Sequence, residues 1–310
     1  MRASLAAMKS SLHDLRFGLR LLARQRPIVG AAILTLALGL GAATTVFSVV
    51  DAILLRPLPF PGPGSLLMLW ERHPERPGDW RLTSAATYAD WRLALDGVVD
   101  LAISEPWRPV LDAGAELRSL QGARVSPDFF AVLGIEPLYG RSFEADDASA
   151  GGARILLTYR AWQRRFGGDP QLVGRSVRLL GGGGSSLATV IGILPPEAHL
   201  AAPMVLGEVE VLAPLDTDPR RRPRGERLAR VIGRLRPGAE LEQARQRLAA
   251  VSRRLAAAYP DSHRDWAAAA APLVELMTAP LKPALYQLTA GAALLFAIAC
   301  ADVAILLLAL

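Results

Sequence analysis

The sequence has a single cysteine in 310 residues, Cys300, which lies inside an apolar run near the C-terminal end. Because a disulfide needs two cysteines, no bridge can form within the chain, and a hydrophobic core has to hold the fold together. Hydrophobic residues make up 51% of the sequence, which is enough for a large core. The composition therefore excludes a disulfide-dependent scaffold and an intrinsically disordered chain.

Metal-ligating residues are scarce and scattered. One group of acidic residues, Glu144, Asp146 and Asp147, gathers in an expected loop, where it either is solvated or binds a cation, and we favour the solvated alternative. The four histidines are far apart and fall in no ligand spacing: His13, His73, His199 and His263. We therefore expect no metal site.

Motifs for nucleotide or nucleophile chemistry are missing from the sequence. The glycine run 181–184 is followed by Ser185 and Ser186, without the lysine that a phosphate-binding loop needs. There is no Gly-x-Ser-x-Gly elbow and no reactive cysteine in a polar setting. The sequence predicts a protein that is not an enzyme, with no cofactor and no catalytic residue.

Acidic residues are almost absent from the first 27 positions, which hold six basic residues against Asp14 alone. Nearly all of the formal charge of +6 therefore lies at one end of the chain, and the remainder is close to neutral. A nucleic-acid partner would require a basic surface on the folded domain, so we expect none.

A long uncharged run follows this basic segment, at residues 28–50. It is too long for the apolar region of a cleaved signal peptide and long enough to cross a bilayer, so we predict a first transmembrane helix at 28–55. Gly39 and Gly41 lie within it at positions where another helix could approach closely. The alternative is that glycine is simply frequent in membrane helices.

The basic segment 1–27 is expected to stay in the cytoplasm, because short positively charged flanks resist translocation. Its leucines are spaced along one helical face beside Arg16 and Arg20, which predicts a basic amphipathic helix on the membrane surface. A solvated basic leader is the alternative. The region after the first membrane helix, at 56–283, is then expected to be exported as one domain.

A second apolar segment, 284–310, is predicted to be a second transmembrane helix, and Asp302 is its only charge. Carboxylates inside membranes usually face a helix bundle, which makes Asp302 a candidate for helix contact or function. The alternative is an aspartate tolerated near the membrane interface.

Between the two membrane segments, short strand patterns alternate with helical patterns, which predicts an α+β domain. The clearest helix is at 241–259, where apolar residues recur at alternating steps of three and four. Other helices are expected at 84–95, 128–133 and 159–166, the second of them capped by Ser126 and Pro127. Strands are expected at 116–125, 154–158, 176–180, 187–193, 208–213, 227–235 and 266–276.

Several stretches, in order along almost the whole chain, resemble the MacB-type, FtsX-like permeases of ABC transporters, especially the orphan bacterial branch in which this module is duplicated. The resemblance implies a periplasmic core domain of two mixed α/β subdomains between two membrane helices, and ATP hydrolysis by a separate subunit. The stretches are at 14–20, 34–61, 126–143, 162–179, 235–244 and 298–309.

Two features depart from the family pattern. Family members continue with two further membrane helices in each module, and they often have Asn at the positions of Ala43, Asp302 and Ile305. We therefore expect a permease subunit, or the N-terminal portion of one, in the bacterial inner membrane. Its expected partners are a separate ABC ATPase, the lipid bilayer and either a second permease module or a second copy. The alternative is a two-helix sensor or interaction protein without transport activity.

Overall fold

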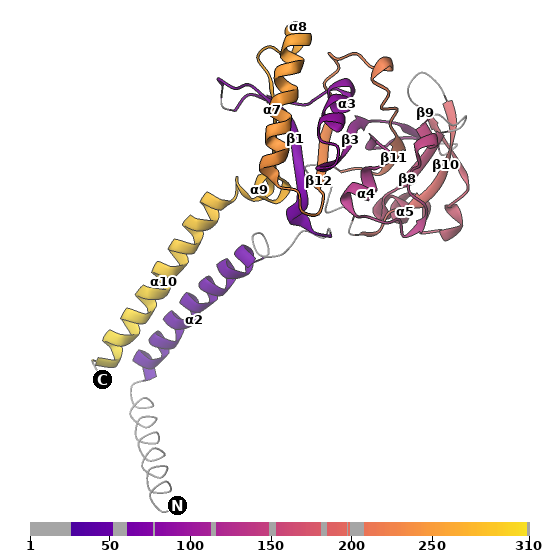
Figure 1. Ribbon diagram of the computed structural model, residues 1–310. Coiled ribbons are helices and arrows are strands. Elements are labelled where there is room, and N and C mark those ends of the chain that lie inside the picture. Colours follow the sequence, from indigo (N-terminus) through magenta and orange to yellow (C-terminus); the bar gives the residue numbers. More distant parts are fainter. Residues whose placement is uncertain are drawn as a thin grey trace, which may run out of the picture. The chain divides into compact units, whose positions relative to one another are not determined.

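The computed structural model describes residues 26–51, 61–76, 78–112, 116–148, 153–180, 185–196, 198 and 208–308. The chain divides into two compact units, which we call the helical unit (residues 1–56 and 278–310) and the core domain (57–277) (Figure 1). The amphipathic helix expected at 1–27 lies almost entirely outside the described residues, as does the glycine run 181–184.

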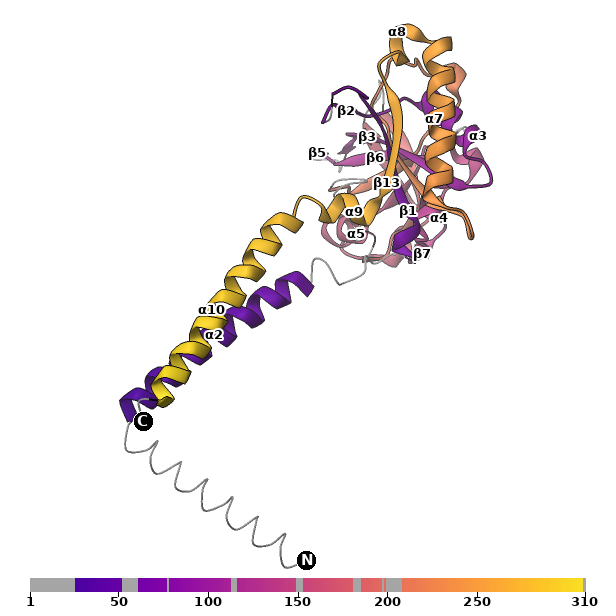
Figure 2. The same cartoon turned by 60° about the vertical axis from the view of Figure 1, so that its left-hand side comes forward.

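The helical unit contains α2 (Arg26–Val50) and α10 (Lys282–Leu308), which lie side by side in both views (Figures 1 and 2). Both are long and apolar enough to cross a membrane. The hydroxyl groups of Thr35, Thr44, Thr45 and Ser48 in α2 each donate to the backbone carbonyl four residues earlier. These bonds satisfy the hydroxyl groups within the helix, so α2 presents no unpaired donor from them to an apolar surrounding.

The core domain is built on one sheet, which has thirteen strands among the described residues. Its main path runs β13-β1-β12-β3-β6-β11-β8-β10-β9-β4-β5, with β2 beside β1 and β7 beside β10. Two pairs, β8–β10 and β6–β11, are parallel and the others are antiparallel, so the sheet is mixed, as an α+β domain requires. The strands are β1 (Leu66–Arg72), β2 (Trp80–Arg81), β3 (Val99–Trp107), β4 (Val110–Asp112), β5 (Leu117–Ser119), β6 (Gly122–Val125), β7 (Tyr139–Gly140), β8 (Ala153–Leu157), β9 (Ser176–Leu180), β10 (Ser185–Ile193), β11 (Val211–Pro214), β12 (Arg230–Leu235) and β13 (Ala267–Pro272).

Helices cover both faces of this sheet. The core-domain helices are α3 (Ala85–Ala94), α4 (Phe129–Leu133), α5 (Tyr159–Phe166), α7 (Leu241–Ala258), α8 (Pro260–His263) and α9 (Leu273–Thr278), with short 3₁₀ turns at Pro63–Ser65, Ala145–Ala148, Pro170–Leu172 and Pro219–Arg221. Strands β13, β1, β12 and β3 pack with α3 and α7 around one apolar cluster that includes Trp91 and Leu248. Strands β8 to β11 pack with α5 around a second cluster that includes Trp162. These are two mixed α/β halves, as the family resemblance implies.

The opposite face of the sheet carries a third apolar cluster, which spans both halves. It includes Phe129 and Phe130 of α4, Leu273 of α9, and Leu66 and Ile232 of the sheet. The two halves therefore share one sheet and one apolar cluster behind it.

Local signals explain the helices that the sequence predicts correctly. Ser84 caps α3 by accepting the N–H of Thr87, and Thr158 caps α5 by accepting the N–H of Ala161. Gly167, at a φ of 65°, ends α5 in the left-handed conformation that glycine adopts without strain. In α7, the apolar face predicted from the spacing is buried against the sheet.

Three local predictions are wrong. The strand expected at 116–125 is two strands, because β5 pairs with β4 whereas β6 pairs with β3 and β11. The strand expected at 266–276 ends at Pro272, which fits a helix start, and Leu273 then begins α9 with its side chain in the core. The Ser126 hydroxyl accepts the N–H of Ile103 in β3 instead of capping α4.

Candidate functional site

The helical unit contains all three residues that the sequence singles out, and it separates them. Gly39 of α2 is buried: a Cβ atom added there would lie 3.0 Å from the Cβ atom of Ala299 and 3.8 Å from the Cα atom of Phe296, both in α10. Ala299 is itself only 2% exposed. The missing side chain of Gly39 therefore lets the backbones of the two helices approach each other.

Gly41 and Asp302 are not at this contact. A Cβ atom at Gly41 would meet no atom within 4 Å among the described residues, and Asp302 is exposed on α10. A role in binding or function for any of the three residues stays a prediction.

We predict that Gly39→Leu separates α2 from α10, because the added side chain overlaps the Ala299 position, whereas Gly41→Leu leaves the pair intact. The measurement is the yield of a disulfide between single cysteines placed in α2 and α10, in a Cys300→Ala background in native membranes. The Gly41 variant is the matched control for added bulk and hydrophobicity. Equal crosslinking in both variants would show that Gly39 is not a packing position in the membrane.

In the core domain, a buried cluster of charged and polar groups lies at the end of β1, and we call it the Glu71 cluster: Glu71, Arg81, Thr83, Arg227 and His263. Glu71 is 2% exposed. Its Oε2 atom accepts from Arg81 and lies 3.4 Å from Nε of Arg227, and its Oε1 atom accepts from the Thr83 hydroxyl at 3.2 Å. One carboxylate is therefore shared by two guanidinium groups and a hydroxyl.

The two arginines of this cluster also bind α8, the short helix that precedes β13. Both donate to the backbone carbonyl of Ser262 in α8, Arg81 at 2.7 Å and Arg227 at 2.9 Å. The Arg81 guanidinium lies 3.8 Å from the centre of the Trp266 ring, within the range of a cation–π contact. The cluster therefore joins the strand that follows the first membrane helix to the segment that precedes the second.

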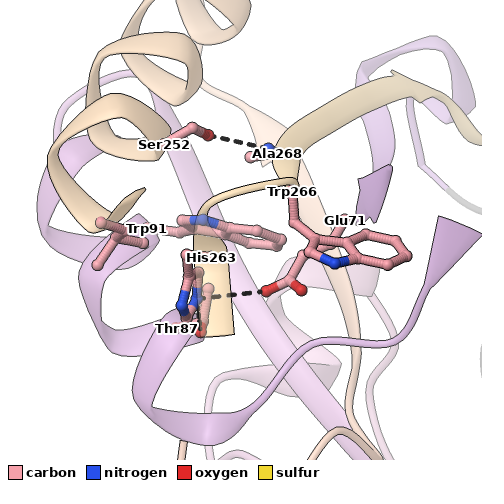
Figure 3. A pocket seen from close by; sticks show the side chains of 8 residues that line it. Glu71, Thr87, Trp91, Ser252, His263, Trp266 and Ala268 are labelled. Atoms are coloured by element: carbon pink, nitrogen blue, oxygen red, sulfur yellow. Dashed lines mark hydrogen bonds and ion pairs between the residues drawn. The ribbon is translucent and has the colours of Figure 1, made fainter. Parts of the chain in front are cut away.

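His263 completes the cluster at a small cavity, which Thr87, Trp91, Ser252 and Trp266 also line (Figure 3). Its Nε2 atom lies 3.1 Å from the Thr87 hydroxyl and 3.7 Å from Oε1 of Glu71, and its Nδ1 atom lies 2.7 Å from the Ser262 hydroxyl. The cavity has room for about one water molecule.

A hydroxyl, an imidazole and a carboxylate in contact resemble the parts of a hydrolytic triad, but this arrangement does not fit one. In a triad the carboxylate is hydrogen-bonded to one ring nitrogen and the hydroxyl to the other. Here the Ser262 hydroxyl is at Nδ1, but Oε1 of Glu71 lies 3.7 Å from Nε2, beyond hydrogen-bonding distance. A substrate also has no room in a cavity of this size. The cluster is a buried structural network, and its members come from β1, β2, the segment before α3, the segment before β12 and α8.

Burial lowers the pKa of His263, and the positive charges of Arg227, Arg81 and Arg224 act in the same direction, whereas the Glu71 carboxylate opposes the shift. The folded protein therefore favours the neutral ring. Because the unfolded chain binds the proton more readily, stability is full above the usual histidine pKa of 6.5 and falls as the pH drops below it.

We predict that the unfolding midpoint of the full chain decreases between about pH 7.5 and about pH 5.5, and that His263→Gln removes most of this dependence. Gln keeps a hydrogen-bonding side chain but has no proton to gain in this range. Thermal unfolding in detergent at each pH measures the effect, with His73→Gln as the control for a second buried histidine. An unchanged pH dependence in His263→Gln would contradict the assignment.

In the acidic group at 144–147, Glu144 and Asp146 are exposed, as expected, and only Asp147 differs from the expectation of solvated side chains. Asp147 is buried, accepts two bonds from Arg141 at 2.7 and 3.0 Å and one from Arg154 at 2.5 Å, and accepts the N–H of Glu144. The bonds from Arg141, above all, lower the pKa of Asp147 below its usual value. The two guanidinium groups occupy the place that a cation would take, and no group of three metal-ligating residues occurs in the described part of the chain.

Sequence reasoning did not find the Glu71 cluster. Its residues are spread from position 71 to position 263, and no local spacing links them. The only hint of the cluster in the sequence is His263, which lies in the polar segment between the helix expected at 241–259 and the strand expected at 266–276.

The comparisons with known proteins agree with this architecture. Residues 29–251 match the family of the MacB-like periplasmic core domain. A domain of a protein described as a permease, from Porphyromonas gingivalis, superposes with a TM-score of 0.51 at 16% identity, over 69% of this chain and 92% of that one. At this identity the likeness shows the fold alone.

Two further solved structures are similar over comparable lengths. They are the periplasmic region of MacB from Actinobacillus actinomycetemcomitans (TM-score 0.48, 11% identity, 70% of this chain and 92% of that one) and the extracellular domain of the noncanonic ABC-type transporter YknZ from Gram-positive bacteria (0.45, 15%, 66% and 99%). No curated protein sequence matches the chain.

Proposed function

Because the chain belongs to the family of the MacB-like periplasmic core domain, we propose that it is a permease subunit, or the N-terminal portion of one, in an ABC transporter of this type. A separate ATPase would hydrolyse ATP in the cytoplasm, and the core domain would move in response, for export or for another process of the cell envelope. Members of the family work with a cytoplasmic ABC ATPase, and the sequence has no phosphate-binding loop of its own.

One observation carries this proposal: the strands nearest to the two membrane helices along the chain are neighbours in the sheet. β1 follows α2 and β13 precedes α10, and the two strands pair antiparallel from Leu67 opposite Pro272 to Arg72 opposite Ala267. The Glu71 cluster ties the far end of this pair to α8. A movement of either membrane helix would therefore act on the same ladder of hydrogen bonds.

Affinity capture tests the ATPase partner. The full chain, tagged and expressed at its natural level, is purified from native membranes, and the proteins that accompany it are identified. We expect an ABC ATPase subunit, enriched over an untagged strain. Repeated capture without an ATPase, or with only signalling or wall-remodelling proteins, would contradict the proposal and favour a sensor.

The orientation of the chain is part of the proposal. We predict that a reporter fused after Arg26 is cytoplasmic and that one inserted at 181–184 is exported, because the basic segment before residue 28 resists translocation. A pair of reporters, one active only in the cytoplasm and one only outside it, makes the measurement at both positions. A cytoplasmic signal from the 181–184 position would overturn this topology.

A further inference from the structure

Two segments that carry the family resemblance meet at one side chain in the core domain, that of Arg234. One is the end of the 34–61 stretch and the other is the helix α4 inside the 126–143 stretch, and Arg234 itself directly precedes the 235–244 stretch. Arg234 lies in β12 opposite Leu66 of β1, so its side chain projects on the face that α4 covers. The proposed function alone does not explain why these segments meet at Arg234.

The first set of contacts is with residues 61–65, which directly precede β1. Nη1 of Arg234 donates to the carbonyl of Pro61 at 2.7 Å, to the Ser65 hydroxyl at 2.9 Å and to the carbonyl of Gly62 at 3.4 Å. The Ser65 hydroxyl in turn donates to the Gly62 carbonyl at 2.8 Å. One nitrogen of Arg234 is therefore hydrogen-bonded to three residues of the turn that precedes β1.

The second set of contacts is with the end of α4. Nε of Arg234 donates to the carbonyl of Val132 at 2.6 Å and Nη2 donates to that of Leu133 at 3.1 Å. These are the last carbonyls of a short helix, which have no partner within it. Gly134 ends the helix at a φ of 68°, and a Cβ atom there would lie 3.1 Å from Pro61, so the turn and the helix end also touch directly.

The Arg234 guanidinium is half-buried and, among the described residues, its hydrogen bonds all go to neutral oxygens. Burial lowers the pKa of Arg234. The planar fork of arginine reaches acceptors on two segments at once, which the single ammonium group of lysine cannot do in the same way. The contacts with both segments therefore depend on the forked shape of the arginine side chain. Its positive charge also complements the carbonyl end of α4.

We propose that Arg234 is the positioning residue that fixes the chain leaving the first membrane helix to the core domain, at the junction of Pro61–Ser65, α4 and β12. Arg234 would pass a displacement of that chain to α4 and β12. This transmission of movement rests on the proposed function, whereas the anchoring does not. Without Arg234, the turn at 61–65 would lose these side-chain hydrogen bonds and, among the described residues, would keep its own bonds and the contact of Pro61 with Gly134.

The test measures how firmly residue 64 is held to the core domain in the full chain, in lipid nanodiscs, without any ATPase. Spin labels are placed on Gly64→Cys and Gly225→Cys in a Cys300→Ala background, and the distance distribution between them is recorded. Both glycines lack a positive φ and have no described atom within 4 Å of an added Cβ, so the labels fit. The matched control is Arg236→Ala, two residues further along the chain, whose guanidinium pairs with Asp100.

We expect a narrow distribution in the parent chain and in Arg236→Ala, and a distribution at least about twofold wider in Arg234→Ala. Arg234→Lys should give an intermediate width, because it keeps the charge and loses the fork. If Arg234→Ala does not fold, the lysine variant decides alone: a width equal to that of the parent overturns the proposal, and a wider one supports it. A narrow distribution in folded Arg234→Ala also overturns it, whether or not an ATPase partner exists.

Discussion

Replacing Gly140 with alanine is expected to lower the free energy of unfolding by about 2–5 kcal/mol. Gly140 has a φ of 78°, a left-handed conformation that costs an L-residue about 1–2 kcal/mol. An added Cβ atom would also lie 2.1 Å from the carbonyl oxygen of Ile191 and 2.8 Å from the Cα atom of Gly192. Strands β7 and β10 would have to separate, which adds about 1–3 kcal/mol for overpacking.

Gly167→Ala is the matched control for Gly140→Ala. Its φ of 65° is similarly left-handed, but a Cβ atom there meets no described atom within 4 Å, so only the conformational cost applies. Thermal unfolding of the full chain in detergent compares the two variants, and each kcal/mol should shift the midpoint by about 2–4 °C. Equal shifts in both variants would mean that β7 does not lie against β10 as described.

The second large effect is expected for Glu71→Gln, which should lower the free energy of unfolding by about 3–5 kcal/mol. The amide keeps the shape of the side chain but removes the negative charge. Arg81 and Arg227 are then left with their side chains 21% and 18% exposed and without their counter-ion. Unpaired, mostly buried guanidinium groups are the reason for the large effect, because the native pair need not add stability of its own.

The control for Glu71→Gln is Glu75→Gln, four residues along the same hairpin at an exposed position. The same change of charge there should leave the unfolding midpoint within the error of the measurement, since exposed charges contribute little. Unfolding of the full chain in detergent at neutral pH, followed by tryptophan fluorescence, provides the comparison. If Glu71→Gln unfolds at the same temperature as Glu75→Gln, the Glu71 cluster does not hold the two ends of the core domain together.

The parts of the fold that could be predicted from the sequence are those with local causes. The serine and threonine caps of α3 and α5, the glycine that ends α5 and the apolar face of α7 all act within a few residues. The same holds for the family stretches rich in glycine. In the 162–179 stretch, Gly167, Gly168 and Gly174 have positive φ values, and Nε1 of Trp162 donates to the carbonyl of Asp169. These residues maintain a turn after α5.

The parts that could not be predicted depend on contacts between distant residues. The expected strand breaks between β5 and β6 because β5 pairs with β4 whereas β6 pairs with β3. The Glu71 cluster joins residues up to 192 positions apart. In the helical unit, the sequence treats Gly39 and Gly41 alike, because only the direction of each Cβ position relative to α10 distinguishes them. No spacing rule for a single helix contains that information.

The most direct test of the transporter assignment compares three strains of the native bacterium: one lacking this chain, one lacking the ATPase that it captures, and one lacking both. Growth is measured against a panel of toxic compounds and envelope stresses. The account predicts that both single deletions share the same sensitivities and that the double deletion is no more sensitive than either. A sensitivity caused by loss of this chain that loss of the ATPase does not reproduce would contradict it, and would favour a membrane-anchored sensor that works without a pump.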